Sequence, residues 1–268
     1  TTRQDYDNGV ALPYGLFSHS DQQEQWHTGI PNERKGSGWG GRMADFLEVL
    51  NTPSPVSMNV SVAGNNLFQV GDAVVPYTVN PWGATHLRGV EDWSPFQDER
   101  KAAVEGLLAL DYRNVLESTY VNMRKNALDA YDAYNAATAI PLPTSIVWGE
   151  DWLSQQLRQV AKVIAGRGVL GARRQVFYVQ WGGWDFHDEV LTNMANMLPV
   201  VSKAVKTFYD CTVAMGLANN VTLFSASDFG RSLTTNSRGS DHAWGGNQFA
   251  VGGAVRGGRI FGRYPELY

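Results

Sequence analysis

The sequence is poor in cysteine. Cys211 is the single cysteine among 268 residues, so no disulfide can form within the chain. It falls in the apolar segment "TFYDCTVAMGL", which has helical character, and no basic residue adjoins it to lower the thiol pKa. We therefore predict a buried structural thiol and not a nucleophile.

The chain also lacks long charged or apolar runs. Its 22 basic and 26 acidic residues give a formal net charge of -4, without a polybasic run or an acidic tail. This pattern predicts no nucleic-acid partner. No apolar run approaches the roughly 20 residues that span a bilayer, so no transmembrane segment is predicted.

What the chain does have is enough apolar sequence for a large core. Hydrophobic residues make up 43% of it, and the length suits one main globular unit. Spacing predicts helices over about 20–27 and 41–51, on either side of a glycine-rich turn. Residues 57–80 have short alternating runs that predict a small strand-rich patch or hairpin, and residues 94–168 form a mainly helical block.

The last hundred residues have a different pattern of apolar residues. "RQVFYVQ" and "NVTLFSAS" are typical of buried strands, and the segment between them, about 189–217, predicts a long helix containing Pro199. Strand, helix and strand in this order predict a βαβ unit with a parallel sheet. The expected fold class is α/β, with a mainly parallel sheet flanked by helices and the helical block inserted.

Acidic and histidine residues follow both predicted strands. Asp185 and His187 come after the first, Asp228 comes after the second, and Asp241 and His242 follow in "GSDHAWGG". Strand ends of a parallel sheet converge at one edge, and carboxylates with imidazoles bind divalent metals. The alternative is that the aspartates cap helices and the histidines lie at the surface. Three such groups in succession favour the metal site.

Several motifs carry a family resemblance. The order "VFYVQWGGWDFH", long helix, "VTLFSASDFGR", "GSDHAWGG" and "VGGAVRGGRIFGRYPEL" resembles exported bacterial proteins known as domain of unknown function 1501. "FSHSDQQEQWHTG" is similar to the Ser-His-x-x-x-Gln-x-x-Trp segment of that family. The family is grouped with the alkaline phosphatase and sulfatase superfamily, so the resemblance implies an alkaline-phosphatase-like fold.

In that superfamily, aspartates and histidines bind one or two metal ions beside a Ser, Thr or modified Cys nucleophile. Asp185 and His187 resemble its Asp-x-x-x-His ligands, with shorter spacing. Asp228 resembles the aspartate of its strand-end Asp-His pair, and His242 the later histidine, for which Asp241 is the alternative. The implied cofactor is a divalent metal: zinc, calcium or manganese.

The sequence departs from the family in three places. Phe229 stands where the superfamily usually has histidine beside the strand-end aspartate. No Gly-Gly-x-Asp strand precedes Ser18, and the usual segment after "YPEL" is absent. We therefore expect residues 1–268 to form a single domain that is a fragment of a longer protein.

The nucleophile has two candidates near a predicted helix start. Ser18 with His19 matches the family, whereas Ser20 is a suitable N-cap, and capping would explain either serine taken alone. A metal-activated water is the other possible nucleophile. Arg231 could hold an oxyanion through its planar donor fork, or it could form a structural ion pair.

Together these features predict a metal-dependent hydrolase of phosphate or sulfate esters, with Ser18, His19 and Arg231 as catalytic residues. The resemblance implies a periplasmic or extracellular protein that acts on a small-molecule or polysaccharide ester. The alternative is a non-catalytic exported binding or assembly protein with a degenerate metal site, partnered by another exported protein. A third hypothesis is a carbohydrate-active protein with Trp-lined subsites.

Overall fold

The structure, a computed structural model, describes residues 3–87 and 95–262. Within these ranges the helices are α1 (Arg3–Asp7), α2 (His19–Thr28), α3 (Trp39–Leu47), α4 (Gln97–Ala109), α5 (Val115–Thr138), α6 (Trp152–Ala165) and α7 (Val190–Ala214). The strands are β1 (Asn59–Ser61), β2 (Tyr77–Thr78), β3 (Val176–Tyr178), β4 (Leu223–Phe224), β5 (Gly230–Arg231), β6 (His242–Ala243) and β7 (Ala250–Val251). The fold is mixed α/β, as the sequence predicts.

Local sequence determines where several helices begin and end. The side chain of Asn114 accepts hydrogen bonds from the first turn of α5, including the Leu116 N–H at 2.9 Å. Asp151 accepts one from the Ser154 N–H at the start of α6. Helix α2 ends at Gly29, whose φ of 67° is left-handed and therefore favours glycine.

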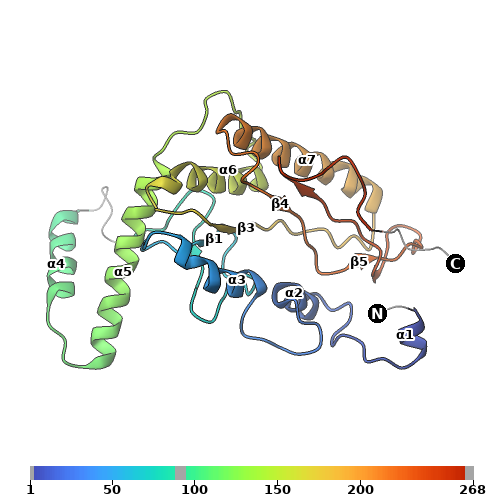
Figure 1. Ribbon diagram of the computed structural model, residues 1–268, viewed down its shortest axis with the longest axis horizontal. Coiled ribbons are helices and arrows are strands. Elements are labelled where there is room, and N and C mark those ends of the chain that lie inside the picture. The colour runs from blue at the N-terminus through green and yellow to red at the C-terminus, as the bar shows by residue number, and fades with distance from the viewer. Residues whose placement is uncertain (1–2, 88–94, 263–268) are drawn as a thin grey trace.

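The main sheet has three short parallel strands in the order β2-β1-β3. Val60 of the central strand lies opposite Tyr77 and Phe177 of its two neighbours. All three residues of β1 are buried. Helices α6 and α7 lie on one side of the sheet and α2 and α3 on the other (Figure 1), which provides the cover that both faces of a parallel sheet need.

The main core lies between α5, α6, α7 and the sheet. It includes Tyr134, Leu157, Phe208 and Cys211, all almost fully buried. Burial raises the pKa of the Cys211 thiol, so the thiol stays protonated and unreactive. The prediction that Cys211 is a buried thiol on a helix is confirmed.

One strand prediction is confirmed only in part and another is wrong. Residues 57–80 do contain two short strands, β1 and β2, but they form no hairpin, because the two strands run parallel and a long connection joins them. Strand β4 does not extend the parallel sheet beside β3 but pairs antiparallel with β7, Leu223 opposite Val251. Nor are these strands deeply buried, since β3 is half-buried and Phe224 is 51% exposed. An apolar run predicts a strand but does not specify its partner.

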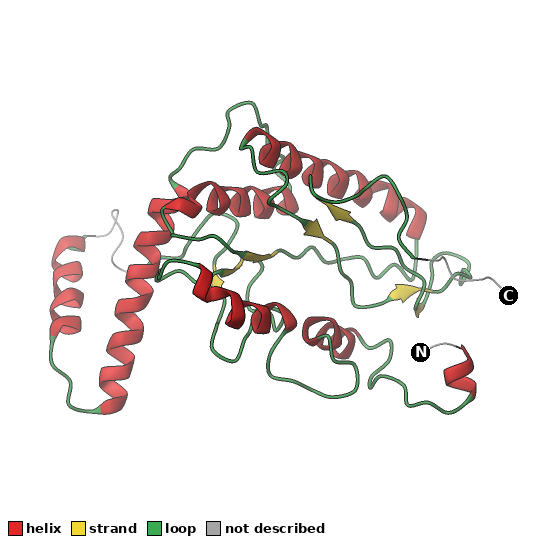
Figure 2. Cartoon of the chain, viewed as in Figure 1, coloured by secondary structure: helices red, strands yellow, loops and turns green. Residues whose placement is uncertain are grey.

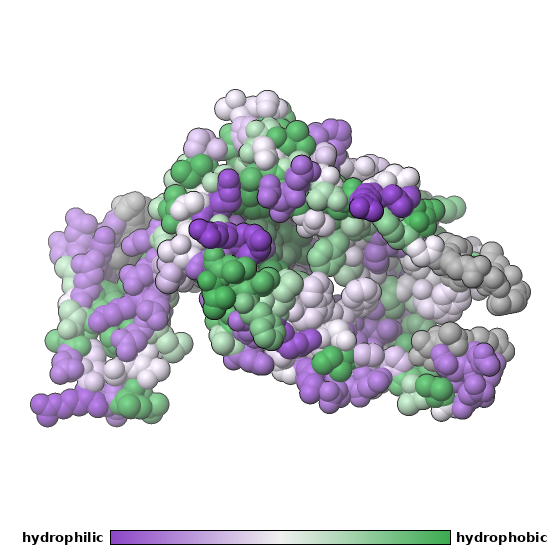
Figure 3. All heavy atoms as spheres, viewed as in Figure 1, coloured by the Kyte–Doolittle hydropathy of each residue, from purple (hydrophilic) through white to green (hydrophobic). Residues whose placement is uncertain are grey.

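Helices α4 and α5 form an antiparallel pair at one end of the molecule (Figure 2). No residue of α4 is buried. A cavity of about 690 Å³ lies along the pair, and its lining includes Val104, Leu107, Tyr120 and Leu128. Figure 3 shows hydrophobic side chains among charged ones on this pair. It is joined to the core by the second half of α5, which contacts α6.

Candidate metal centre

Five segments, from three widely separated parts of the sequence, meet in one cluster of polar side chains. Asp185 and His187 lie in the loop after β3, and Asp228 lies in the loop after β4. His242 is on β6, whose partner β5 carries Arg231 directly opposite. The fifth segment is the start of α2, whose first residue, His19, reaches the same cluster.

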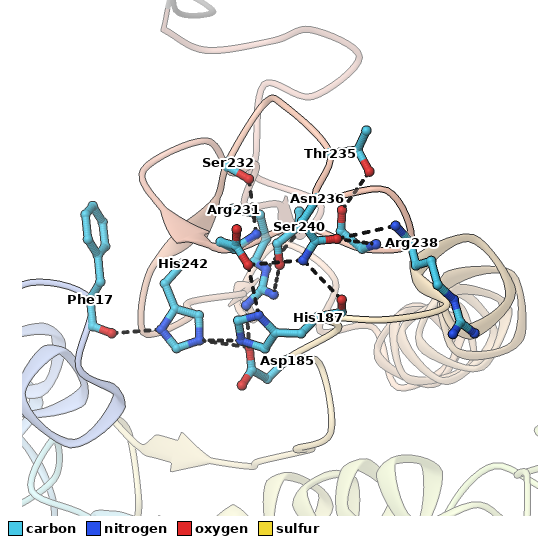
Figure 4. A network of polar contacts seen from close by, with 12 residues as sticks. Phe17, Asp185, His187, Arg231, Ser232, Thr235, Asn236, Arg238, Ser240 and His242 are labelled. Carbon is cyan, nitrogen blue, oxygen red and sulfur yellow. Dashed lines mark hydrogen bonds and ion pairs between the residues drawn. The ribbon is translucent and has the colours of Figure 1, made fainter.

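Asp185 contacts most of the other members of this cluster, and Figure 4 shows it beside His187 and His242. Its Oδ2 lies 3.2 Å from Nε2 of His19, and its Oδ1 lies 3.0 Å from Nε2 of both His187 and His242. Arg231 also donates to Oδ1. Burial raises the pKa of Asp185, but the hydrogen bonds from Arg231, His19 and His242 outweigh it and hold that pKa at about 2. Asp185 is therefore a carboxylate at any physiological pH.

Each of the three histidines is held through its other ring nitrogen, Nδ1. In His19 this atom lies 2.8 Å from Oδ2 of Asp228, and in His187 it lies 3.2 Å from Oδ1 of Asp241. In His242 it lies 2.9 Å from the backbone oxygen of Phe17. Carboxylate and carbonyl oxygens only accept, so each Nδ1 carries a proton. A neutral ring then has its Nε2 lone pair directed into the cluster.

These lone pairs and the charge of Asp185 favour a positive charge within the cluster. In the neutral rings, the three Nε2 atoms would direct electron pairs at the ionised Asp185, which is unfavourable unless a proton or a cation lies between them. Nε2 of His187 is 2.9 Å from Nε2 of His242, so one proton can lie between them as an N–H···N hydrogen bond but two N–H groups would collide there. Arg231 supplies one positive charge to Asp185. A divalent cation would satisfy the remaining lone pairs at once.

The donor set fits a transition metal. Ligand atoms of His19, Asp185 and His242 all lie within 4.8 Å of one another. Two imidazole nitrogens and a carboxylate oxygen are ordinary ligands of zinc and manganese, whereas calcium prefers oxygen ligands. Histidines held from behind by carboxylates or carbonyls are typical of metal sites. The side chains of His19 and Asp185 are 45% and 40% exposed, so solvent and a ligand can reach them.

The predicted ligands thus occupy two layers. Asp185, His187 and His242 lie in the cluster itself, together with His19, which the sequence predicts as catalytic. Asp228 and Asp241 are joined to it through ring nitrogens of His19 and His187. In this arrangement the two aspartates are placed to orient the histidines.

Ser18 lies between two residues that contact the cluster. It is the N-cap residue of α2, and its side chain makes no capping hydrogen bond. Its Oγ is 3.4 Å from Oγ of Ser20. The residues on both sides of Ser18 contact the cluster, Phe17 through its backbone oxygen and His19 through its ring. Phe17 has a φ of 66°, a strained conformation for a bulky residue and one that is often found at functional sites.

Each side-chain nitrogen of Arg231 donates to one protein group. Besides Asp185, Arg231 donates to the backbone oxygen of Ser240 and, at 3.3 Å, to Oγ of the same residue. Of the two roles considered for Arg231, the structural ion pair is the one that these contacts represent. The second N–H of each terminal nitrogen is left for another acceptor, such as an oxyanion.

Phe229 covers the cluster from one side. Its ring centroid is 4.3 Å from that of His242 and 4.7 Å from that of His19. The phenyl ring therefore packs on two of the imidazoles and offers no ligand atom at this position.

Sequence analysis did not identify three supporting groups. Gln23 donates to Asp228 at 3.1 Å, and Asn236 donates to Asp241 at 3.1 Å. The third group is the Phe17 backbone oxygen. The four-residue spacing of His19 and Gln23 on one helix face is a sequence signal that could have identified Gln23. No side-chain pattern identifies a backbone carbonyl.

The protein therefore belongs to the class of mixed α/β proteins that carry a histidine–aspartate cluster at the ends of their strands. The family model described as protein of unknown function (DUF1501) matches residues 1–268, so the chain belongs to this family. No curated protein matches the chain. No solved structure matches it either. Among the described helices, none combines the length and the apolar character needed to cross a membrane.

Proposed function

We propose that this protein is a metal-dependent hydrolase of phosphate or sulfate esters with an alkaline-phosphatase-like fold. One observation carries the proposal: His19, Asp185 and His242 bring their ligand atoms within 4.8 Å of one another. The fixed orientation of the three imidazoles supports it, because their Nε2 atoms converge on a carboxylate that stays ionised. Zinc or manganese suits these donors better than calcium.

The residues around the site have separate tasks in this proposal. His19, Asp185 and His242 would hold the ion, and His187 is close enough to join them. The bound ion would polarise the ester oxygen and offset the charge that develops on the phosphate or sulfate. Arg231 would stabilise the same anion through the N–H groups that do not bind Asp185 or Ser240.

Ser18 is the proposed nucleophile, with water as the alternative. It stands at the N-terminus of α2, where the helix dipole stabilises an oxyanion, and both of its neighbours contact the cluster. Ser20, which the sequence leaves open as an alternative, is the second residue of α2 and lies within its first turn.

The first prediction concerns metal content and turnover. The purified protein should contain about one zinc or manganese ion per chain and hydrolyse p-nitrophenyl phosphate or p-nitrophenyl sulfate. Asp185→Asn and His242→Ala should lose the ion and lower kcat/KM at least about 100-fold, because each removes a ligand. Elemental analysis and initial rates provide the measurement. His86→Ala, on the α4–α5 side of the molecule, is the control and should change neither.

A protein without bound metal, and with no gain in activity when zinc or manganese is added, would refute the proposal. Ser18→Ala separates the two nucleophiles. If serine attacks, this variant loses turnover but keeps the ion, whereas activation of water leaves turnover largely intact.

The second candidate is a non-catalytic exported protein with a degenerate site. Two contacts favour it: Arg231 already pairs with Asp185, and the Phe229 ring covers His19 and His242. This candidate predicts metal binding without turnover of either ester. Another exported protein would then be its partner.

Location and substrate are also part of the proposal. The alkaline phosphatase and sulfatase superfamily supports a periplasmic or extracellular protein that acts on a small-molecule or polysaccharide ester. Cell fractionation of the full-length protein tests this, and recovery of it solely from the cytoplasm would contradict export.

A further inference from the structure

A buried glutamine on α6 contacts the start of the loop that carries two of the cluster residues. Gln156 is fully buried. Its Nε2 donates to the backbone oxygen of Gln180 at 2.9 Å, and its Oε1 accepts from the Gln180 N–H at 3.0 Å. One amide side chain thus satisfies both peptide groups of a single residue.

This contact takes the place of a hydrogen bond from a neighbouring strand. Strand β1 still pairs with the end of β3, because the Val62 N–H donates to the Tyr178 oxygen. Two residues further on, at Gln180, the donor and the acceptor come from Gln156 on a helix. In an extended chain the backbone N–H and C=O groups of successive residues point to opposite edges, so those of Tyr178 and Gln180 point to the same edge. A hydrogen-bonding partner at Gln180 therefore fixes the direction in which the chain leaves the sheet.

The segment after Gln180 leads directly to the cluster. Trp184 donates from Nε1 to the Trp181 backbone oxygen at 2.9 Å, which closes a short turn, and Asp185 and His187 follow. Gln156 therefore contacts the chain where it leaves β3, and a single short turn separates that contact from Asp185 and His187.

We propose that Gln156 is a positioning residue for the metal centre, acting through the backbone of Gln180. This inference rests on the proposed function, because it assigns Gln156 to the same metal site. The amide does not touch the cluster side chains. Its effect is to hold the loop so that Asp185 and His187 meet His242 at the observed distances.

The chain contains a matched control one turn further along α6. Gln159 is also buried, at 2% exposed, but its Nε2 donates to the Tyr134 hydroxyl at 2.7 Å and contacts the core. Gln156→Leu and Gln159→Leu remove equivalent buried amides. Only the first releases the loop, so the pair separates positioning of the site from general stability.

Zinc affinity of the full chain should fall about tenfold in Gln156→Leu and change less than about twofold in Gln159→Leu, although both lower the melting temperature. Gln156→Glu keeps the acceptor for the Gln180 N–H and should recover part of the affinity. Equal losses in the two leucine variants, or no loss in Gln156→Leu, would overturn the inference.

Histidine ring NMR signals of the metal-free protein give an independent test. They should shift for His187 in Gln156→Leu and stay in place in Gln159→Leu. If the wild-type protein bound no metal, the proposed function would fail, while these signals would still decide whether Gln156 positions the loop. Unchanged His187 signals in Gln156→Leu would refute that role.

Discussion

Asp228 determines the protonation of His19. Its hydrogen bond to Nδ1 is the main cause of the raised pKa of His19, which burial opposes and Asp185 reinforces. A raised pKa means that protons compete with a metal for Nε2 up to a higher pH than 6.5, the ordinary value. Metal affinity of the wild-type protein should therefore increase as pH rises through the pKa of His19.

Asp228→Asn should lower the pKa of His19 and move this dependence to lower pH. At a pH above the pKa of His19 in both proteins, where the ring is neutral in either one, the variant should bind zinc about tenfold more weakly, because the ring has lost the carboxylate that orients it and increases its basicity. NMR titration of the metal-free protein and zinc titration measure the two effects.

Asp241→Asn is the matched variant, since Asp241 contacts His187 in the same way. It should leave the pKa of His19 in place. If Asp228→Asn left both the pKa and the affinity unchanged, then Asp228 would not be orienting His19.

For individual residues, the sequence predicts which ones form the cluster better than it predicts what each of them contacts. Asp185 and His187 could be found because they follow an apolar run, and strand ends gather ligands. The sequence could not predict that Asp185 lies among the histidine Nε2 atoms while Asp228 lies behind His19. These roles depend on the direction in which each ring nitrogen points. That direction is fixed by contacts between residues more than 160 positions apart.

Among the elements, α3 is distinguished by how closely it approaches the segment after β1. A Cβ atom on Gly41 would lie about 2.0 Å from the backbone of Val70, and the Gly41 N–H donates to the Phe68 oxygen. Asp45, one turn later, accepts from three successive N–H groups, including that of Val74. Helix α3 therefore holds this segment by backbone contact, for which only glycine leaves room.

Gly41→Ala should reduce the free energy of unfolding by about 1–3 kcal/mol, because the helix or the segment must move to admit a methyl group. Chemical denaturation measures the change. Gly36→Ala is the control, since Gly36 has open space around its Cβ position and an ordinary φ, and it should stay within about 0.5 kcal/mol of the wild-type protein. A neutral Gly41→Ala would show that the contact yields easily.

Elements were predictable where their signals are local. Helix α2 covers the predicted range 20–27, and α6 begins at an aspartate cap. The pairing of β4 with β7 was not predictable, because apolar runs of similar composition fit either neighbour and the choice is made by distant chain segments.

For the molecule as a whole, stability is uneven. Helix α6 buries most of one face against α5, α7 and the sheet, whereas no residue of α4 is buried, and a cavity of about 690 Å³ lies beside α4. Local opening needs little free energy where few apolar contacts are lost. Opening of α4 should therefore be separable from unfolding of the core and from the candidate metal centre at the opposite end of the molecule (Figure 1).

Native-state hydrogen exchange should show this order directly. Amides of α4 should exchange at least about 100-fold faster than those of α6, and added zinc should slow exchange around Asp185 and His242 without slowing it in α4. Helix α7 is the internal control, since Phe208 and Cys211 anchor it in the same core as α6 and its amides should be similarly protected. Equal protection of α4 and α6 would mean that the molecule opens as one cooperative unit, with the helical pair coupled to the metal centre through α5.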